Sequence, residues 1–215
     1  MLHKEESHNY YEYFRTYFAG NLDASKEMME LLETLVDPEI PVREMLDAML
    51  RSEDEDVLFK MYKFVDDLGD QFLAGMLCER LRELDPESLL YMRKLAHCIY
   101  NQKEYEQAES MYLECLALCT IKFGKEHPDT LDSMNGLANC LGNQQKHDKS
   151  EPMYRECLAL RTAKLGKDHP DTLSSINNLA DCLDEQEKYE QSEPMFRECL
   201  ALNTAKLGKE HPDTL

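Results

Sequence analysis

The side chains best suited to chemistry recur at a fixed spacing. Histidine appears in FGKEHPDTL, LGKDHPDTL and LGKEHPDTL, as His127, His169 and His211, and successive copies are 42 residues apart. An imidazole could act there as a general acid or base, or ligate a metal ion. No second ligand stands at a short spacing on the same helix face, so we interpret the three histidines as structural and predict no metal site.

Eight cysteines form the other candidate set. Six of them fall into two series of period 42, one of Cys98, Cys140 and Cys182 and the other of Cys115, Cys157 and Cys199. A cysteine at the same place in each copy is better explained as a small core residue than as a disulfide partner. The sequence has no CxxC pair for zinc, and its first residues, MLHKEESHNYYEYF, contain no apolar signal region. We therefore expect unpaired thiols and a cytoplasmic location.

Composition narrows the class of function. The 215 residues carry 43 acidic and 24 basic side chains, a formal charge of −19. Such a chain repels nucleic acid and anionic membranes, and its longest apolar runs are too short to span a bilayer. The sequence contains no nucleophile–base pair and no phosphate loop, so we predict that it is not an enzyme and needs no cofactor.

The repeated HPDTL segments mark joints between helices. Each has a glycine suited to the left-handed position after a helix, a proline suited to the first turn of the next, and an aspartate near that helix's positive end. These residues are Gly124, Gly166 and Gly208; Pro128, Pro170 and Pro212; Asp129, Asp171 and Asp213. His-Pro-Asp also resembles the signature of J-domain co-chaperones, but its recurrence in phase with a helical repeat favours a joint.

Between the joints the sequence predicts pairs of amphipathic helices. The first helix of each pair has one regular apolar stripe. Its residues are Leu89, Met92, Leu95, Ala96 and Ile99; Leu131, Met134, Leu137, Ala138 and Leu141; Leu173, Ile176, Leu179, Ala180 and Leu183. One hairpin cannot cover such faces alone, whereas stacked hairpins can.

The segments NNLADCL, EKYEQSEPMFRECLAL and LGKDHPDTL resemble tetratricopeptide repeats, in particular the long repeats of kinesin light chains. The small residues of the family pattern match Ala96, Ala138, Ala180, Ala108, Ser150 and Ser192, and its aromatic residue matches Tyr112, Tyr154 and Phe196. The resemblance implies an all-α fold, a right-handed superhelical solenoid of antiparallel helix pairs. Residues 1–52 do not match the family, and their own pattern predicts an irregular helical N-terminal segment.

We divide the chain accordingly. Residues 1–52 form an irregular helical cap that includes an aromatic-rich helix at Tyr10–Gly20, and residues 53–86 form a degenerate 34-residue repeat. The long repeats are 87–128, 129–170 and 171–212, and residues 213–215 begin a truncated further repeat. The acidic run from Glu53 to Asp56 is explained by the start of a helix.

A second, polar stripe follows the first helices. In tetratricopeptide arrays such positions line the concave groove that binds a peptide or helix, so the resemblance implies a site formed by Arg93, His97, Asp132, Asn135, Asn139, Ser174, Asn177 and Asp181. An asparagine amide both donates and accepts, which suits pairing with a peptide backbone. The alternative is that these side chains merely face water.

The predicted function is therefore a protein–protein interaction scaffold or adaptor. Arg93 at one end and Asp132 and Asp181 further along indicate a neutral or basic peptide partner rather than an acidic one. Two alternatives remain: a regulatory repeat arm of a longer enzyme or signalling ATPase, and a structural solenoid that self-associates through an uncapped C-terminal end.

Overall fold

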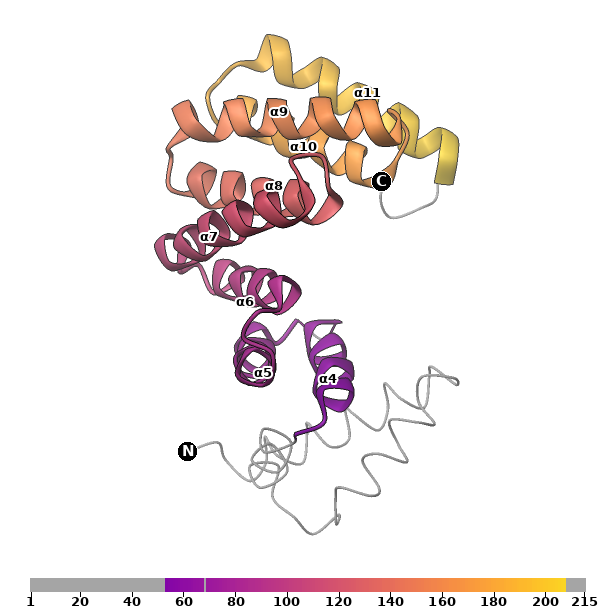
Figure 1. Ribbon diagram of the computed structural model, residues 1–215. Helices are drawn as coiled ribbons and strands as arrows, with labels where there is room; N and C mark the ends of the chain where they lie inside the picture. Colours follow the sequence, from indigo (N-terminus) through magenta and orange to yellow (C-terminus); the bar gives the residue numbers. More distant parts are fainter. Residues whose placement is uncertain (1–52, 68, 208–215) are drawn as a thin grey trace, which may run out of the picture. The chain divides into compact units, whose positions relative to one another are not determined.

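The computed structural model describes residues 53–67 and 69–207. The predicted cap of residues 1–52, with its aromatic-rich helix, lies outside them, as does the third joint with His211. The described residues form α-helices in the following order (Figure 1): α4 (Glu55–Asp67), α5 (Gln71–Leu84), α6 (Leu89–Asn101), α7 (Tyr105–Phe123), α8 (Pro128–Asn143), α9 (His147–Leu165), α10 (Pro170–Asp184) and α11 (Tyr189–Leu207).

The chain divides into two compact units between Phe64 and Val65. In the first unit, α4 begins within the acidic run, and Glu55 and Asp56 occupy its first turn, as predicted. Negative charge there interacts favourably with the helix dipole.

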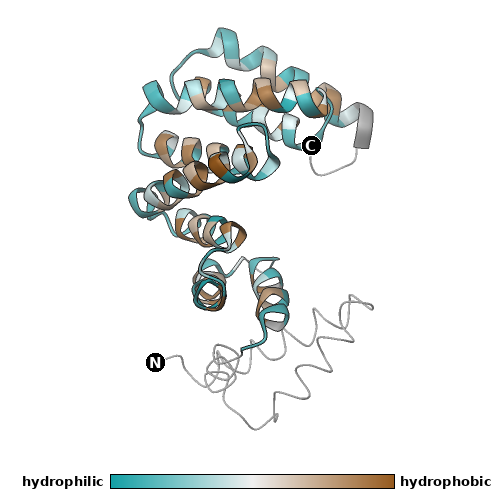
Figure 2. Cartoon of the chain, in the orientation of Figure 1, coloured by the Kyte–Doolittle hydropathy of each residue, from teal (hydrophilic) through white to brown (hydrophobic). Residues whose placement is uncertain are grey.

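In the second unit each helix packs against the next one along the chain, from α5 to α11. In addition α6 contacts α8, and α8 contacts α10, so the first helices of successive pairs also touch one another. This pattern confirms the predicted all-α solenoid of helix pairs. In Figure 2 the helices carry hydrophobic residues on one side and hydrophilic residues on the other, as stacked amphipathic helices require.

The joints hold their shape through glycine, proline and histidine. Gly124 has φ 90° and ψ 166°, and Gly166 has φ 89° and ψ 166°. The positive φ just after each helix confirms the predicted left-handed position, and the accompanying ψ belongs to a region open almost only to glycine. Pro128 and Pro170 occupy the first turns of α8 and α10, as predicted.

The two described joint histidines each cap a helix, which agrees with their predicted structural role. His127 is the N-cap of α8, and its ring Nδ1 accepts a hydrogen bond from the backbone N–H of Asp129 at 3.2 Å. His169 caps α10 in the same way, with the N–H of Asp171 at 3.2 Å. Each imidazole therefore satisfies one of the backbone donors that a helix start leaves unpaired.

The turns inside the pairs also repeat. Lys103, Gln145 and Glu187, again 42 residues apart, have positive φ angles of 67°, 61° and 60°. After α8, the N–H of Lys146 bonds the carbonyl of Leu141 at 2.9 Å, while the N–H of Gln145 bonds that of Gly142 at 2.7 Å. This pair of bonds is a Schellman motif, here formed without glycine at the left-handed position.

The predicted apolar stripes are buried, with Leu89 half-buried at the start of α6. All eight cysteines are buried and none is in a disulfide. In each long repeat a thiol of the second helix donates to a leucine carbonyl at the start of the first: Cys115 to Leu89 at 3.7 Å, Cys157 to Leu131 at 3.5 Å and Cys199 to Leu173 at 3.6 Å. Burial raises the pKa of the Cys115 thiol to about 11, so it is protonated and unreactive near neutral pH.

Candidate peptide-binding face

Three helices, α6, α8 and α10, position the polar residues that the sequence singled out. We call the following eight residues the first-helix face: Arg93 and His97 of α6; Asp132, Asn135 and Asn139 of α8; Ser174, Asn177 and Asp181 of α10. On each helix they are three or four residues apart, so they share one side of it. His97, Ser174 and Asp181 are exposed, and the other five are half-buried.

The structure brings Arg93 and Asp132 together directly. Arg93 Nη1 donates to Asp132 Oδ2 at 3.0 Å, and its Nη2 donates to Asp129 Oδ1 at 2.8 Å. The other carboxylate oxygen of Asp132 accepts from Arg161 Nη2 at 2.6 Å. Two arginines and two aspartates from α6, α8 and α9 thus form one ion-pair network, which largely neutralises this part of the face.

Arg161 is a site residue that sequence reasoning missed. It is 5% exposed, and its Nη1 also donates to the carbonyl of Asp171 at 3.0 Å and to Ser175 Oγ at 2.8 Å. The equivalent positions in the neighbouring repeats hold Cys119 and Asn203. The sequence did contain a signal for this residue: it is charged at a position that is small or polar in the neighbouring repeats. Since a buried arginine needs polar partners, that difference could have indicated an ion pair.

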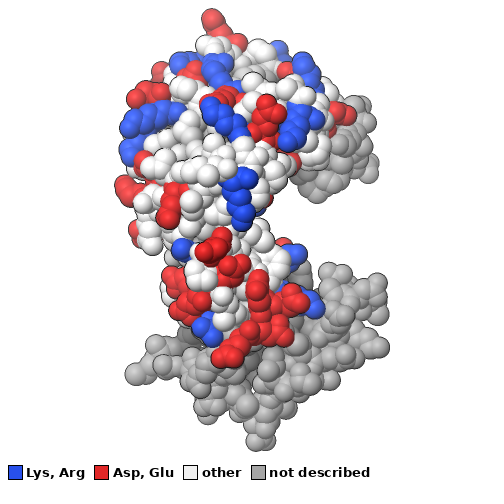
Figure 3. All heavy atoms as spheres, in the orientation of Figure 1, with Lys and Arg blue, Asp and Glu red and all other residues white. Residues whose placement is uncertain are grey.

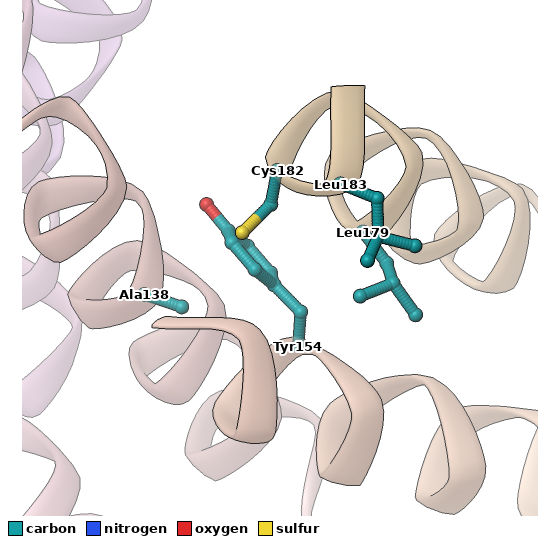
Figure 4. Packing of buried hydrophobic residues seen from close by; sticks show 5 residues of the cluster. All are labelled: Ala138, Tyr154, Leu179, Cys182 and Leu183. Atoms are coloured by element: carbon teal, nitrogen blue, oxygen red, sulfur yellow. The ribbon is translucent and has the colours of Figure 1, made fainter. Parts of the chain in front are cut away.

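Two of the asparagines of α8, Asn135 and Asn139, are each bonded at one end of the side-chain amide. Asn135 Oδ1 accepts from Asn178 Nδ2 of α10 at 2.9 Å. Asn139 Oδ1 accepts from the Tyr154 hydroxyl of α9 at 2.7 Å. Figure 4 shows the Tyr154 ring between Ala138 of α8 and the residues of α10 that complete its cluster, which are Leu179, Cys182 and Leu183.

Further side-chain bonds between neighbouring repeats extend this pattern. Asn143 Nδ2 donates to the Tyr100 hydroxyl of α6 at 2.9 Å, and Asn101 Nδ2 donates to Gln71 Oε1 of α5 at 2.9 Å. A row of side-chain hydrogen bonds therefore crosses from each repeat to the next. The bonds of the described residues use the Oδ1 atoms of Asn135 and Asn139, which leaves the Nδ2 donors of both amides available.

The third repeat places its residues differently. Asn177 is half-buried, and Ser174 Oγ donates to the carbonyl of Pro170 at 3.0 Å. Desolvation raises the pKa of Asp181, and the nearby carboxylates of Glu185 and Asp184 raise it further. Phe196 stands where the earlier repeats have Tyr112 and Tyr154, so no hydroxyl is present to bond Asp181 as Tyr154 bonds Asn139.

At the other end, His97 forms a polar and aromatic group with its neighbours. Its Nε2 lies 3.1 Å from Asn101 Nδ2, and its ring stacks on Tyr100 with centroids 6.4 Å apart. Desolvation lowers the pKa of His97, although the Asp66 carboxylate opposes that shift. The imidazole is therefore neutral at pH 7 and adds no positive charge to the face.

Two further properties of the described residues bear on other functions. No three His, Cys, Asp or Glu side chains among them lie so that they could hold a metal ion. None of the described helices has the length and apolar character needed to cross a membrane.

Comparison with known proteins identifies the repeats. A family profile described as tetratricopeptide repeat matches residues 87–162 and 133–205, which together are more than half of the chain. This agrees with the resemblance seen in the repeated segments. No curated protein matches the sequence.

Solved structures show the same fold. A point variant of a Podosopora anserina protein, described as a kinesin light chain with nearly identical TPR-like repeats, matches with a TM-score of 0.62 at 18% identity, over 95% of this chain and 98% of that one. BtubC (BKLC) from P. vanneervenii matches with a TM-score of 0.63 at 17% identity, over 94% and 76%. MamA from Desulfovibrio magneticus RS-1 matches with a TM-score of 0.57 at 12% identity, over 86% and 98%.

Proposed function

The chain belongs to the tetratricopeptide repeat family, and we propose from this that it is a protein–protein interaction scaffold whose first-helix face binds an extended peptide of a partner. The tetratricopeptide repeat fold generally mediates protein–protein interaction. The proposal for this chain concerns the place and the chemistry of that interaction.

The observation that supports the proposal is a pair of asparagine amides on α8 whose oxygen atoms are hydrogen-bonded to other described residues and whose NH2 groups are not. Asn135 and Asn139 are each held by one hydrogen bond at Oδ1, from Asn178 and Tyr154. Their orientation is thereby fixed, and their Nδ2 groups can donate to the carbonyls of a bound backbone. Side chains fixed before binding lose little conformational entropy when the peptide arrives, which favours affinity.

Charge supports a neutral to basic peptide. Arg93 and Arg161 are paired with Asp129 and Asp132, so they offer little to an acidic ligand. At the opposite end of the first-helix face, the C-terminus of α10 has the exposed carboxylates of Asp181, Asp184 and Glu185. Lys or Arg side chains of a peptide would relieve the mutual repulsion of these carboxylates, whereas an acidic peptide would add to it.

A peptide-display selection on the whole chain tests the proposal. We expect enriched peptides to be neutral or basic and to bind Asn139→Ala at least about tenfold more weakly, since truncation removes a directed donor. Tyr154→Phe is the comparison variant. It removes the bond that orients the Asn139 amide but keeps the amide donor, so it should weaken binding less than Asn139→Ala does. Equal affinity for wild type and Asn139→Ala, or enrichment of mainly acidic peptides, would contradict the proposal.

A second pair of variants tests the charge preference. Asp181→Asn with Asp184→Asn removes two exposed carboxylates of α10, one on the first-helix face and one beside it, and Glu190→Gln with Glu198→Gln removes two from α11. We expect only the first pair to weaken a basic peptide, by about fivefold at low salt, with a smaller salt dependence of affinity. If the pairs behave alike, general attraction to an acidic protein explains the preference. A mass that rises with concentration in light scattering would instead support the self-associating alternative.

A further inference from the structure

One second helix departs from its equivalents on its outward side. On α7, Leu113 is 58% exposed and Ile121 is 83% exposed, with the exposed Ala117 between them. The equivalent residues of α9 are Arg155, Ala159 and Ala163. The same fold thus carries a polar or small residue where α7 exposes two large aliphatic side chains.

The equivalent helix α9 has an ion pair at the place where α7 has Leu113. Arg155 donates to Glu151 at 2.9 Å, four residues earlier on its own helix. Arg197, at the same place in α11, pairs with Glu193 in the same way. Leu113 cannot form that bond with Glu109, so the change replaces a solvated ion pair with exposed apolar surface, which costs free energy unless something covers it.

The three residues form one ridge, which we call the α7 ridge. Leu113, Ala117 and Ile121 are spaced by four residues, so they lie in line over about 12 Å of helix. Hydrophobic residues run along α7 in Figure 2, and Figure 3 shows a largely uncharged surface over α7 and α8 in this view. Rows with a spacing of four are the ridges that helices use when they pack on one another.

We propose that the α7 ridge docks a basic amphipathic α-helix of a partner protein. The exposed carboxylates of Glu106 and Glu114 flank the ridge on the same side of α7, and no basic group of the described residues is paired with either of them. A helix with an apolar row of spacing four and Lys or Arg beside it matches both the shape and the charge. A second copy of this chain fits less well, because it would bring the same carboxylates together in a chain of charge −19.

The site is distinct from the first-helix face, since it lies on a second helix and shares no residue with that face. A partner helix on α7 and a peptide on α6, α8 and α10 would therefore be independent interactions. A scaffold with both could hold two partners, or two segments of one partner.

The test uses a displayed library of amphipathic helices, selected on the whole chain and counter-selected on Leu113→Ala with Ile121→Ala. This variant gives α7 the small side chain that α9 has at Ala163, and it leaves the net charge unchanged, so we expect its thermal unfolding to match wild type. Selected helices should have Lys or Arg beside an apolar row and should bind the variant at least about tenfold more weakly, which corresponds to about 1.4 kcal/mol.

A gain-of-function variant completes the design. Arg155→Leu with Ala163→Ile gives α9 the same exposed aliphatic side chains that α7 has at Leu113 and Ile121. This variant should therefore have a second site for the same helices. Equal binding to wild type and the Leu113→Ala, Ile121→Ala variant would overturn the proposal, as would enrichment of acidic helices or of none. A wild-type dimer that the variant abolishes would assign the ridge to a second copy instead. Peptide binding at the first-helix face should persist in the variant, so the two proposals fail separately.

Discussion

The sharpest stability prediction concerns Glu151, which ties two successive repeats together. It accepts hydrogen bonds from Lys188 Nζ at 2.7 Å and Gln186 Nε2 at 3.0 Å, both on the following repeat, and from Arg155 Nη2 at 2.9 Å. Its side chain is 17% exposed. The bond from Lys188 is the main cause that lowers the pKa of Glu151 from 4.5 to about 2, and the bonds from Arg155 and Gln186 add to it.

The size of the effect follows from that shift. A fall from 4.5 to about 2 corresponds to ~3 kcal/mol between the ionised and protonated forms. Lys188 and Arg155 are 40% and 48% exposed, so water screens part of this interaction. We therefore expect Glu151→Gln, which mimics the protonated acid, to lower the free energy of unfolding by about 1–2 kcal/mol at pH 7 and the Tm by about 4 °C.

The pH dependence has a definite sign. Because the pKa in the folded state is lower than in the unfolded state, the contribution of Glu151 is fully present above about pH 4.5. It is lost as the pH falls through about 2. Urea unfolding of wild type and Glu151→Gln should therefore differ at pH 7, converge as the pH falls below 4.5, and coincide near pH 2.

The repeats provide matched controls for this reasoning. Glu109 stands at the place of Glu151 in the preceding repeat. It accepts from Lys146 at 2.9 Å and from Gln144 at 2.8 Å, but it has no arginine at the next turn. Glu193 stands at this place in the following repeat, and its side chain is 62% exposed. Glu109→Gln should cost less than Glu151→Gln, and Glu193→Gln should change stability by no more than ~0.5 kcal/mol. If Glu193→Gln costs as much as Glu151→Gln, the bonds between repeats do not explain the loss of stability, and the reasoning is refuted.

Three smaller changes test the packing and the caps by thermal unfolding. Gly136→Ala should cost about 1–3 kcal/mol, since its Cβ would overlap the Tyr112 ring; an unchanged Tm would mean that the ring moves aside. His127→Ala should lower the free energy of unfolding by about 1 kcal/mol and His127→Asn by much less, because asparagine, unlike alanine, has a side-chain acceptor that can replace the imidazole in the cap. Equal losses for the two variants would argue against the cap. Tyr154→Phe should cost about 1 kcal/mol through the lost bond to Asn139, and no loss would show that water replaces the hydroxyl.

Much of the fold was determined by the sequence alone, because it depends on local and periodic features. The spacing of Leu131, Met134, Leu137 and Leu141 sets the buried side of α8 whatever lies against it. Proline and glycine at the joints limit the backbone directly, so the helix starts at Pro128 and Pro170 could be predicted. The buried cysteines followed from their repetition in phase with the helices.

The chemistry of the first-helix face needed the tertiary structure. The helical period predicted which residues share a side of α8, but the partners of Asp132, Asn135 and Asn139 are 15 to 43 residues away in the chain. Whether Arg161 turns inward to Asp132 depends on the packing of α9 against α8 and α10. The sequence determined the helices and their buried sides because these depend on near neighbours, and only the packing of successive repeats decided which polar groups pair and which remain available to a partner.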